Sequence, residues 1–274
     1  TLLLILDNSK AEIMQYANQD ELTQLKSRRY GLTQMQQALL AMGDKQDFSV
    51  ILLDLDWFKN INDNYGHDVG DQVLSEVAQT LLKSLSEEVI VSRYGGEEFL
   101  IVLPDTTHEG AMTIAKQLRK DIAQQVIKSD DNVDFYITAS LGVYTLTHEE
   151  RARIQNEYKA LALEENTQAL AEPRKNRKQL DRRQGERRQE RGSHSSNQAG
   201  AQQTHAQKRI SHRTKRAAKE IVQAQLPSDI CQRLICTADK ALYEAKDRGR
   251  NQVVSANHML AAEKDKIAVL YATS

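Results

Sequence analysis

The chain has 274 residues, with 37 basic and 38 acidic side chains, and 40% of its residues are hydrophobic. This length allows one large domain or one domain with an appendage, and it can bury a core without disulfides. The two cysteines, Cys231 and Cys236, exclude a disulfide scaffold and a zinc finger, so we expect a reducing, cytoplasmic setting. No stretch approaches the roughly 20 apolar residues of a transmembrane helix.

The near-zero net charge conceals an uneven distribution. Residues 151–220 carry 18 basic and 8 acidic side chains, a net charge of +10, which leaves −11 for the rest of the chain. Residues 172–216 contain almost no Val, Ile, Leu or Phe, so burial cannot offset the entropy of ordering them. We therefore expect a long, disordered basic insertion over 151–225. Its arginines would suit nucleic-acid phosphates or an anionic membrane, but no aromatic residue is interleaved for base stacking, which favours a solvated linker.

Apolar periodicity predicts the elements in chain order. We expect a helical region over 9–42 with a break near 20–29, then a buried strand over 48–53 and a polar stretch over 60–66. Further helices are expected over 69–85, 108–126 and 230–245. Further strands are expected over 89–91, 99–103, 135–143 and 252–254. Gly95 and Gly96 suit the positive φ angles of a tight hairpin. This order of elements predicts an α+β fold, a central, mostly antiparallel sheet flanked by helices.

Acidic residues follow two of the predicted strands. Asp54 and Asp56 end the buried strand, and Glu97 and Glu98 follow the glycine pair. Carboxylate oxygens in a small cluster suit Mg²⁺, which keeps waters and takes phosphate oxygens as further ligands. Strand alternation would place only one of the two glutamates beside the cluster, unless the turn distorts the strand. On spacing alone, ordinary acidic residues at a hairpin edge are the simpler interpretation.

Four segments, in chain order, resemble the GGDEF family of diguanylate cyclases. Residues 93–99 (RYGGEEF) are similar to the family's GGDEF or GGEEF signature. Residues 54–63 (DLDWFKNIND), continued by 65–71 (YGHDVGD), resemble the family's DxDxFKxxND segment. Residues 20–29 (DELTQLKSRR) resemble its opening motif DxLTGLxNRR, and residues 238–251 (ADKALYEAKDRGRN) resemble its closing motif ADxALYxAKxxGRN.

The resemblance implies a fold similar to the palm of nucleotidyl cyclases and polymerases. It implies a helical lead-in over 1–19 from a missing upstream region, a catalytic domain over 20–150 and 226–255, the insertion over 151–225, and a C-terminal tail over 256–274. The implied reaction joins two GTP molecules into cyclic di-GMP and releases two pyrophosphates. Because each subunit would hold one GTP, catalysis would need a homodimer. An upstream sensory domain is also implied, and membrane attachment of the full-length protein is compatible with it.

The resemblance also assigns a role to each site residue. Mg²⁺, or Mn²⁺ in its place, would be held by Asp54, the Leu55 carbonyl and Glu97, with Glu98 as an additional candidate. Glu97 would accept the proton of the 3′-hydroxyl group. The residues implied in substrate binding are Asn62 and Asp71 at the guanine edge, His67 near it, Trp57 and Leu74 as apolar walls, Gly95 and Gly96 where the backbone approaches the nucleotide, and Lys59, Lys246 and Arg250 at the triphosphate. Each of these positions has an ordinary structural interpretation too, as a helix-end cation, a cap, a turn or a rim residue.

The sequence departs from the family pattern in the opening motif and upstream of the signature. Gln24 and Ser27 replace the usual Gly and Asn, from which we expect altered local geometry rather than lost chemistry. Residues 86–89 (SEEV) stand where the family has its RxxD product-inhibition site, so we expect no high-affinity feedback there. A catalytically silent domain that binds GTP or cyclic di-GMP as a regulatory module is the alternative function, and the intact GGEEF signature argues against it.

Overall fold

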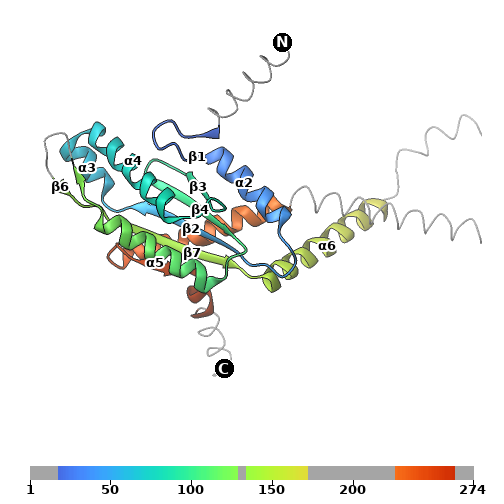
Figure 1. The fold of residues 1–274 in the computed structure, drawn as a ribbon. Coiled ribbons are helices and arrows are strands. Elements are labelled where there is room, and N and C mark those ends of the chain that lie inside the picture. Colours follow the sequence, from blue (N-terminus) through green and yellow to red (C-terminus); the bar gives the residue numbers. More distant parts are fainter. Residues whose placement is uncertain (1–17, 129–133, 172–225, 263–274) are drawn as a thin grey trace, which may run out of the picture. The chain divides into compact units, whose positions relative to one another are not determined.

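The computed structural model describes residues 18–128, 134–171 and 226–262 (Figure 1). The chain divides into two compact units, one formed by residues 1–151 with 227–274 and the other by residues 152–226. Most of the predicted lead-in over 1–19, residues 172–225 of the predicted insertion and the end of the predicted tail lie outside the described residues.

A six-stranded mixed sheet forms the centre of the first unit, in the order β1-β3-β4-β2-β7-β8. Its strands are β1 (Lys26–Ser27), β2 (Phe48–Leu55), β3 (Ile90–Arg93), β4 (Glu98–Pro104), β7 (Ala139–Leu146) and β8 (Val253–Ser255), while β5 (Ile127–Lys128) and β6 (Asp134–Phe135) form a separate pair. The pairings within β3-β4-β2-β7 are antiparallel, and those of the edge strands β1 and β8 are parallel. The predicted, mostly antiparallel α+β sheet is confirmed.

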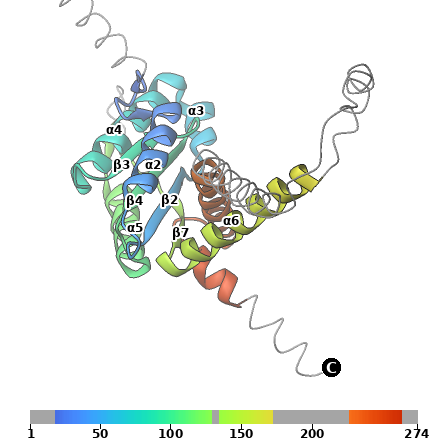
Figure 2. The same cartoon turned by 90° about the vertical axis from the view of Figure 1, so that its right-hand side faces the viewer.

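Helices cover both faces of the sheet. The described helices of the first unit are α2 (Arg28–Ala41), α3 (Phe58–Tyr65), α4 (His67–Ser84), α5 (His108–Gln124) and the helical residues 226–247 and 256–262, whereas α6 (His148–Ala171) belongs mainly to the second unit. In Figures 1 and 2, α4 and α5 lie on one face, and α2 and the helix at 226–247 lie on the other. Within the described ranges, no helix is long and apolar enough to cross a membrane.

The strand β2, like its neighbour β7, is buried along its whole length. All its residues are buried, as its uniform apolar run predicts for a strand that is covered on both faces. One face of β2 packs against α4 and α5 in the main core, for example through Leu53, Val77 and Leu118. On the other face, a Cβ at Gly142 of β7 would collide with the backbone of residues 238 and 242, so the absence of a side chain lets the helix at 226–247 lie directly on the sheet.

Four details differ from the sequence prediction. The strand predicted over 135–143 is interrupted at residues 136–138, which separate β6 from β7. The polar stretch at 60–66 lies largely in α3, because Phe58 and Ile61, three residues apart, face inward and the polar residues face solvent. The glycines 95 and 96 have no positive φ angle; among the described glycines, only Gly66 and Gly249 do. Finally, α6 occupies the first 21 residues of the predicted insertion (151–171) as a regular helix.

Candidate active site

The end of β2 carries a buried carboxylate that is paired with a lysine. Asp54 is 5% exposed, and its Oδ2 lies 2.7 Å from Nζ of Lys246, near the end of the helix at 226–247. Burial raises the pKa of Asp54, and the Lys246 ammonium opposes this shift. In the part of the chain that the structure describes, the buried Oδ1 of Asp54 has no hydrogen-bond partner. A buried charged oxygen without a partner is costly, so this atom is suited to a cationic ligand.

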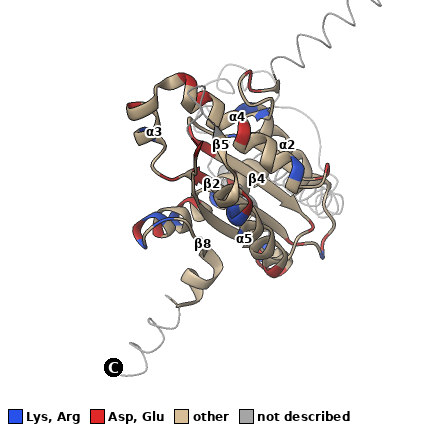
Figure 3. Ribbon diagram, turned by 60° about the vertical axis from the view of Figure 1, so that its left-hand side comes forward, with Lys and Arg blue, Asp and Glu red and all other residues tan. Residues whose placement is uncertain are grey.

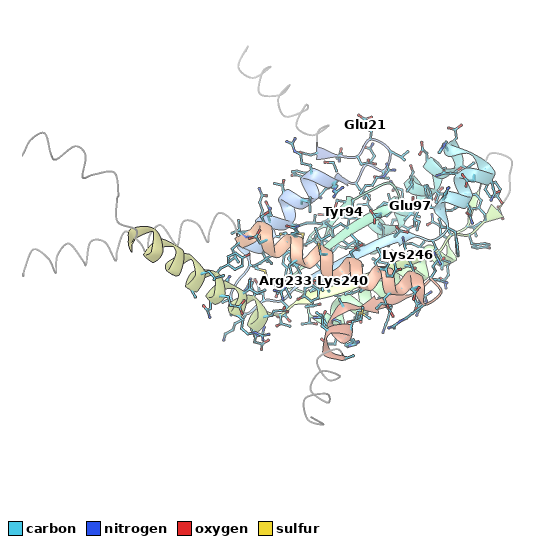
Figure 4. The ribbon with its side chains drawn as sticks, turned by 180° about the vertical axis from the view of Figure 1, so that it is seen from behind. Glu21, Tyr94, Glu97, Arg233, Lys240 and Lys246 are labelled. Carbon is cyan, nitrogen blue, oxygen red and sulfur yellow. The ribbon has the colours of Figure 1, made fainter. Side chains whose placement is uncertain are left out.

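Glu97 and Glu98 bring two further carboxylates to the same place. Glu98 is the β4 partner of Asp54, and Glu97 lies in the turn before β4, where its carbonyl accepts a hydrogen bond from Leu55 N at 3.3 Å. Burial raises the pKa of both glutamates, and the negative charge of Asp54 raises each pKa further. The charge of Asp54 therefore acts on both glutamates. Strand alternation does not place them on opposite faces, because Glu97 lies in the turn and only Glu98 lies in β4. Figure 4 shows Glu97 and Lys246 at the same end of the sheet, far from Arg233.

The glycine pair of the signature allows close packing rather than an unusual backbone conformation. A Cβ at Gly95 would collide with Oε2 of Glu98, whereas Gly96 has open space around its Cα. The small size of Gly95 thus lets the Glu98 side chain fold against the turn. The predicted positive φ angles at Gly95 and Gly96 are wrong, because Arg93 shapes the turn by donating from Nε and Nη2 to the Gly96 carbonyl, at 3.1 and 2.9 Å.

Arg93 also connects the signature turn to the opening motif. Its Nη1 donates to Oδ1 and Oδ2 of Asp20 at 3.2 and 3.3 Å. Burial raises the pKa of the Asp20 carboxyl, but hydrogen bonds from Thr23 and the Arg93 charge outweigh it and lower the pKa overall. Neither motif by itself predicts this pair, which attaches the turn that carries Glu97 to the opening motif.

The carboxylates have the right chemistry for a divalent cation, but they do not form a complete ligand shell. Among the described residues, no three His, Cys, Asp or Glu side chains are arranged to hold a metal ion. Mg²⁺ commonly takes only one or two carboxylates and completes its shell with water and substrate phosphates. The unpartnered Oδ1 of Asp54 and the raised pKa values of the three carboxyls fit such a cation. Asp54, Glu97 and Glu98 are the carboxylates that could hold it.

Two of the predicted phosphate-binding cations, Lys246 and Arg250, lie beside this cluster. The C-terminal part of the helix at 226–247 and the turn after it carry both basic and acidic residues (Figure 3). The guanidinium of Arg250 lies 3.9 Å from the centre of the Trp57 ring, and its Nη1 donates to the Lys246 carbonyl at 3.4 Å. Trp57 is 60% exposed, so this stacked pair forms an open rim next to Asp54. Lys59, in the first turn of α3, is exposed.

The residues predicted to bind guanine lie at the junction of α3 and α4. Asn62 of α3 lies against Gly70 of α4, where its Oδ1 occupies the space that a Cβ would need, and Asp71 follows Gly70. The junction therefore places the Asn62 amide next to the turn of α4 that carries Asp71. His67 is exposed at the start of α4. Leu74 is only 2% exposed and packs in the main core, so its predicted contact with guanine stays a prediction.

Comparison with known proteins identifies the family. The family model "Diguanylate cyclase, GGDEF domain" matches residues 17–179, which is more than half of the chain. The chain belongs to the GGDEF domain family. This GGDEF chain is 34% identical over 139 residues to diguanylate cyclase A of Treponema denticola, and 38% identical over 119 residues to the response regulator PleD of Caulobacter vibrioides. These matches cover 49% and 43% of the chain, but only 37% and 26% of the two relatives.

Solved structures support the same fold. The active GGEEF domain of a diguanylate cyclase from Vibrio cholerae aligns with a TM-score of 0.50 and 25% identity, over 85% of this chain and 98% of that one. The coiled coil and GGDEF domain of DgcB from Caulobacter crescentus, solved with c-di-GMP, aligns with a TM-score of 0.59 over 92% of this chain and 93% of that one. At 20% identity, the second likeness shows the fold alone.

Proposed function

We propose that this GGDEF domain is an active diguanylate cyclase that condenses two GTP molecules into cyclic di-GMP with release of two pyrophosphates. The observation that carries the proposal is the buried Oδ1 of Asp54, which has no partner among the described residues, at the centre of three carboxyls with raised pKa values. Perturbed carboxyls next to partly exposed cations, here Lys246 and Arg250, are typical of sites that bind and transform a charged substrate. Family membership supports cyclic di-GMP as the product.

The residues of the site can take separate roles in phosphoryl transfer. The 3′-oxygen of one GTP attacks the α-phosphorus of the other, and the bond to the leaving pyrophosphate breaks. Glu97 accepts the proton of the 3′-hydroxyl as the general base. Lys246 and Arg250 bind the triphosphate and offset the charge that develops on the leaving group. Mg²⁺, when bound by Asp54 and Glu97, supplies positive charge to the phosphate oxygens.

The side chains that would select guanine lie at the α3–α4 junction. The Asn62 amide can donate to and accept from the guanine edge, and the Asp71 carboxylate accepts from the ring N–H and amino groups. Adenine lacks that pair of donors on the same edge, so it would leave the carboxylate unpaired. The two reacting hydroxyls belong to different GTP molecules, and we therefore propose that two copies of the domain face each other during catalysis. We also propose a cytoplasmic site of action, where GTP is available.

The direct test is to incubate the purified chain with GTP and Mg²⁺ and to measure cyclic di-GMP by chromatography with mass detection. We expect product from the wild type and a loss of turnover of about 10²- to 10⁴-fold in Glu97→Ala, the contribution typical of one general base. Glu88→Ala, which removes an exposed acidic residue, is the matched control and should retain full turnover. GTP binding without any product in the wild type would favour a silent regulatory module instead.

A further inference from the structure

Asp56 is a buried carboxylate near the site to which the family resemblance assigns no role. It directly follows β2 and is 3% exposed. Its Oδ1 accepts a hydrogen bond from Ser140 Oγ at 2.7 Å, and its Oδ2 accepts from Thr138 Oγ1 at 2.7 Å and from Asn251 N at 2.9 Å. The carboxylate therefore connects three segments, the end of β2, the start of β7 and the turn after the helix at 226–247.

The turn that Asp56 holds has a disfavoured backbone conformation. Arg250 and Asn251 have φ angles of 66° and 46°, in the left-handed region that residues with a Cβ rarely adopt. Such conformations persist only where surrounding contacts hold them. Here Asp56 binds the Asn251 N–H, and Nη1 of Arg119 donates to the carbonyl and Oδ1 of Asn251 at 3.3 and 2.7 Å.

The bond between Asp56 and Asn251 explains why Arg250 meets Trp57. Trp57 follows Asp56 and Arg250 precedes Asn251, so one hydrogen bond brings the neighbouring side chains together, with the guanidinium 3.9 Å from the ring centre. Asp54, two residues before Asp56, binds Lys246, four residues before Arg250, at 2.7 Å. Two contacts thus attach the end of the helix at 226–247 and the turn after it to the end of β2.

We propose that Asp56 is a positioning residue that fixes the turn 248–251, so that Arg250 and Lys246 face the triphosphate of GTP. This proposal rests on the proposed function. Asp56 would act by accepting hydrogen bonds rather than by binding the metal, because three of its four lone-pair sites are already used. Cations that neighbouring groups hold in place need no reorganisation when the phosphates arrive, and a small misplacement weakens their contribution strongly.

Replacement by Asn and by Ala separates positioning from metal binding. In Asp56→Asn, the amide oxygen can still accept from Thr138 and Asn251, and the NH₂ group can donate to the Ser140 hydroxyl. We expect this variant to retain most of the affinity for a non-hydrolysable GTP analogue with Mg²⁺. In Asp56→Ala, we expect the affinity to fall about 10- to 100-fold, which corresponds to the loss of one hydrogen bond to a charged group. In turnover assays, the KM for GTP should rise more than kcat falls.

A spectroscopic signal reports on the turn without any turnover. Trp57 is the only tryptophan of the chain, so its near-ultraviolet circular dichroism and its fluorescence report the stacked Arg250. We expect the signal to change in Asp56→Ala and to stay close to wild type in Asp56→Asn. Tyr144→Phe, which removes a buried hydroxyl at the other end of the sheet, is the control for a merely structural defect and should leave the Trp57 signal and the KM unchanged.

The possible results distinguish the two proposals. If Asp56→Asn abolishes binding of the analogue as fully as Asp54→Asn does, Asp56 is a metal ligand and the positioning role is wrong. An unchanged Trp57 signal and KM in Asp56→Ala would also overturn it. If the Ala variant does not fold, Thr138→Val removes one donor to Oδ2 and should shift the KM in the same direction by less. A wild type that binds the analogue but makes no cyclic di-GMP refutes the proposed function and leaves the binding and Trp57 tests of Asp56 intact.

Discussion

The two ends of β2 are built differently. At the Phe48 end, Ser49 Oγ donates to the Thr106 carbonyl at 2.7 Å and lies 2.8 Å from Thr145 Oγ1, and the Asn257 amide pairs with the Thr145 backbone. At the Asp54 end, a buried oxygen has no partner among the described residues, and three carboxyls have raised pKa values. Satisfied polar groups favour stability, whereas unsatisfied charge favours the binding of a charged ligand.

The Asp54 end of β2 is also the region where most of the unusual backbone φ angles lie. Of the five described residues other than glycine that have a positive φ angle, three lie at the Asp54 end, namely Trp57, Arg250 and Asn251. Strained residues of this kind persist where the surrounding structure holds them, and they cluster at sites of function. The polar groups named at the Phe48 end of β2 are thus hydrogen-bonded to one another, whereas the Asp54 end combines positioned residues with carboxyl groups that are suited to a charged ligand.

The largest expected effect comes from replacing the central carboxylate. Asp54→Asn removes a charge that would hold the metal, and we expect turnover to fall about 10³-fold, in line with the several kcal/mol that a metal contributes. Because ionised Asp54 is unfavourable in the metal-free fold, the variant should unfold at the same temperature as the wild type or higher. Turnover at wild-type level, measured as cyclic di-GMP per folded protein, would contradict the assignment of the site.

The second prediction concerns the opposite end of the sheet. Tyr144 is 1% exposed, and its hydroxyl donates to both Glu150 oxygens at 2.9 Å, while Arg233 pairs with the same carboxylate. Tyr144→Phe should lower the free energy of unfolding by about 1–3 kcal/mol, because the buried side of Glu150 loses its donor. Urea unfolding measures the loss, and turnover of the folded protein should not change. Tyr136→Phe, at a residue 64% exposed, is the control.

The pH dependence of stability tests the raised pKa of Glu98. Burial and the Asp54 charge raise this pKa in the folded state, so ionised Glu98 destabilises the fold at neutral pH. Glu98→Gln removes this penalty and should raise the unfolding temperature at neutral pH without metal. As the pH falls through the folded-state pKa, the wild type takes up its proton and the difference should shrink. If the higher unfolding temperature of Glu98→Gln persists unchanged in acidic solution, the charge of Glu98 is not its cause. Glu88→Gln, which changes the net charge equally, is the control.

The smallest expected effect lies in the opening motif. Gln24 stands where the family has Gly, and its φ angle is 59°, in the left-handed region. Gln24 thus adopts the left-handed conformation that a glycine favours, and the predicted alteration of the local geometry stays a prediction; the conformation itself is disfavoured for a side chain and not for glycine. Gln24→Gly should raise the free energy of unfolding by about 0.5–1 kcal/mol, measured by urea unfolding. Gln24→Ala should show no such gain, and equal stabilisation by both variants would contradict the explanation.

The sequence was sufficient to predict the elements that have a local pattern of apolar residues. The apolar run of β2 and the helical spacing of α4 and α5 predicted buried elements, and the motifs predicted that Asp54, Glu97 and Lys246 act together. Ser27, which replaces Asn in the opening motif, caps α2 by accepting from Tyr30 N, so this departure preserves the local structure.

The contacts of Asp56 could not be predicted from the sequence. Its donors come from residues 82, 84 and 195 positions away along the chain, and no local pattern indicates such pairings. The conformation of the Gly95–Gly96 turn depends on Arg93 and Asp20, which lie in two different motifs. In both cases the structure depends on a hydrogen bond between residues that are far apart in the sequence, Asp56 with Asn251 and Arg93 with Asp20.

The most direct test of the central claim is the binding of Mn²⁺, a spectroscopic substitute for Mg²⁺, in the presence of a non-hydrolysable GTP analogue. Electron paramagnetic resonance measures the free ion in solutions of the wild type and of Asp54→Asn. We predict that the wild type with the analogue removes Mn²⁺ from solution beyond what the analogue alone binds, and that Asp54→Asn does not. Equal Mn²⁺ binding by both proteins would show that the carboxylates at the end of β2 do not hold the ion.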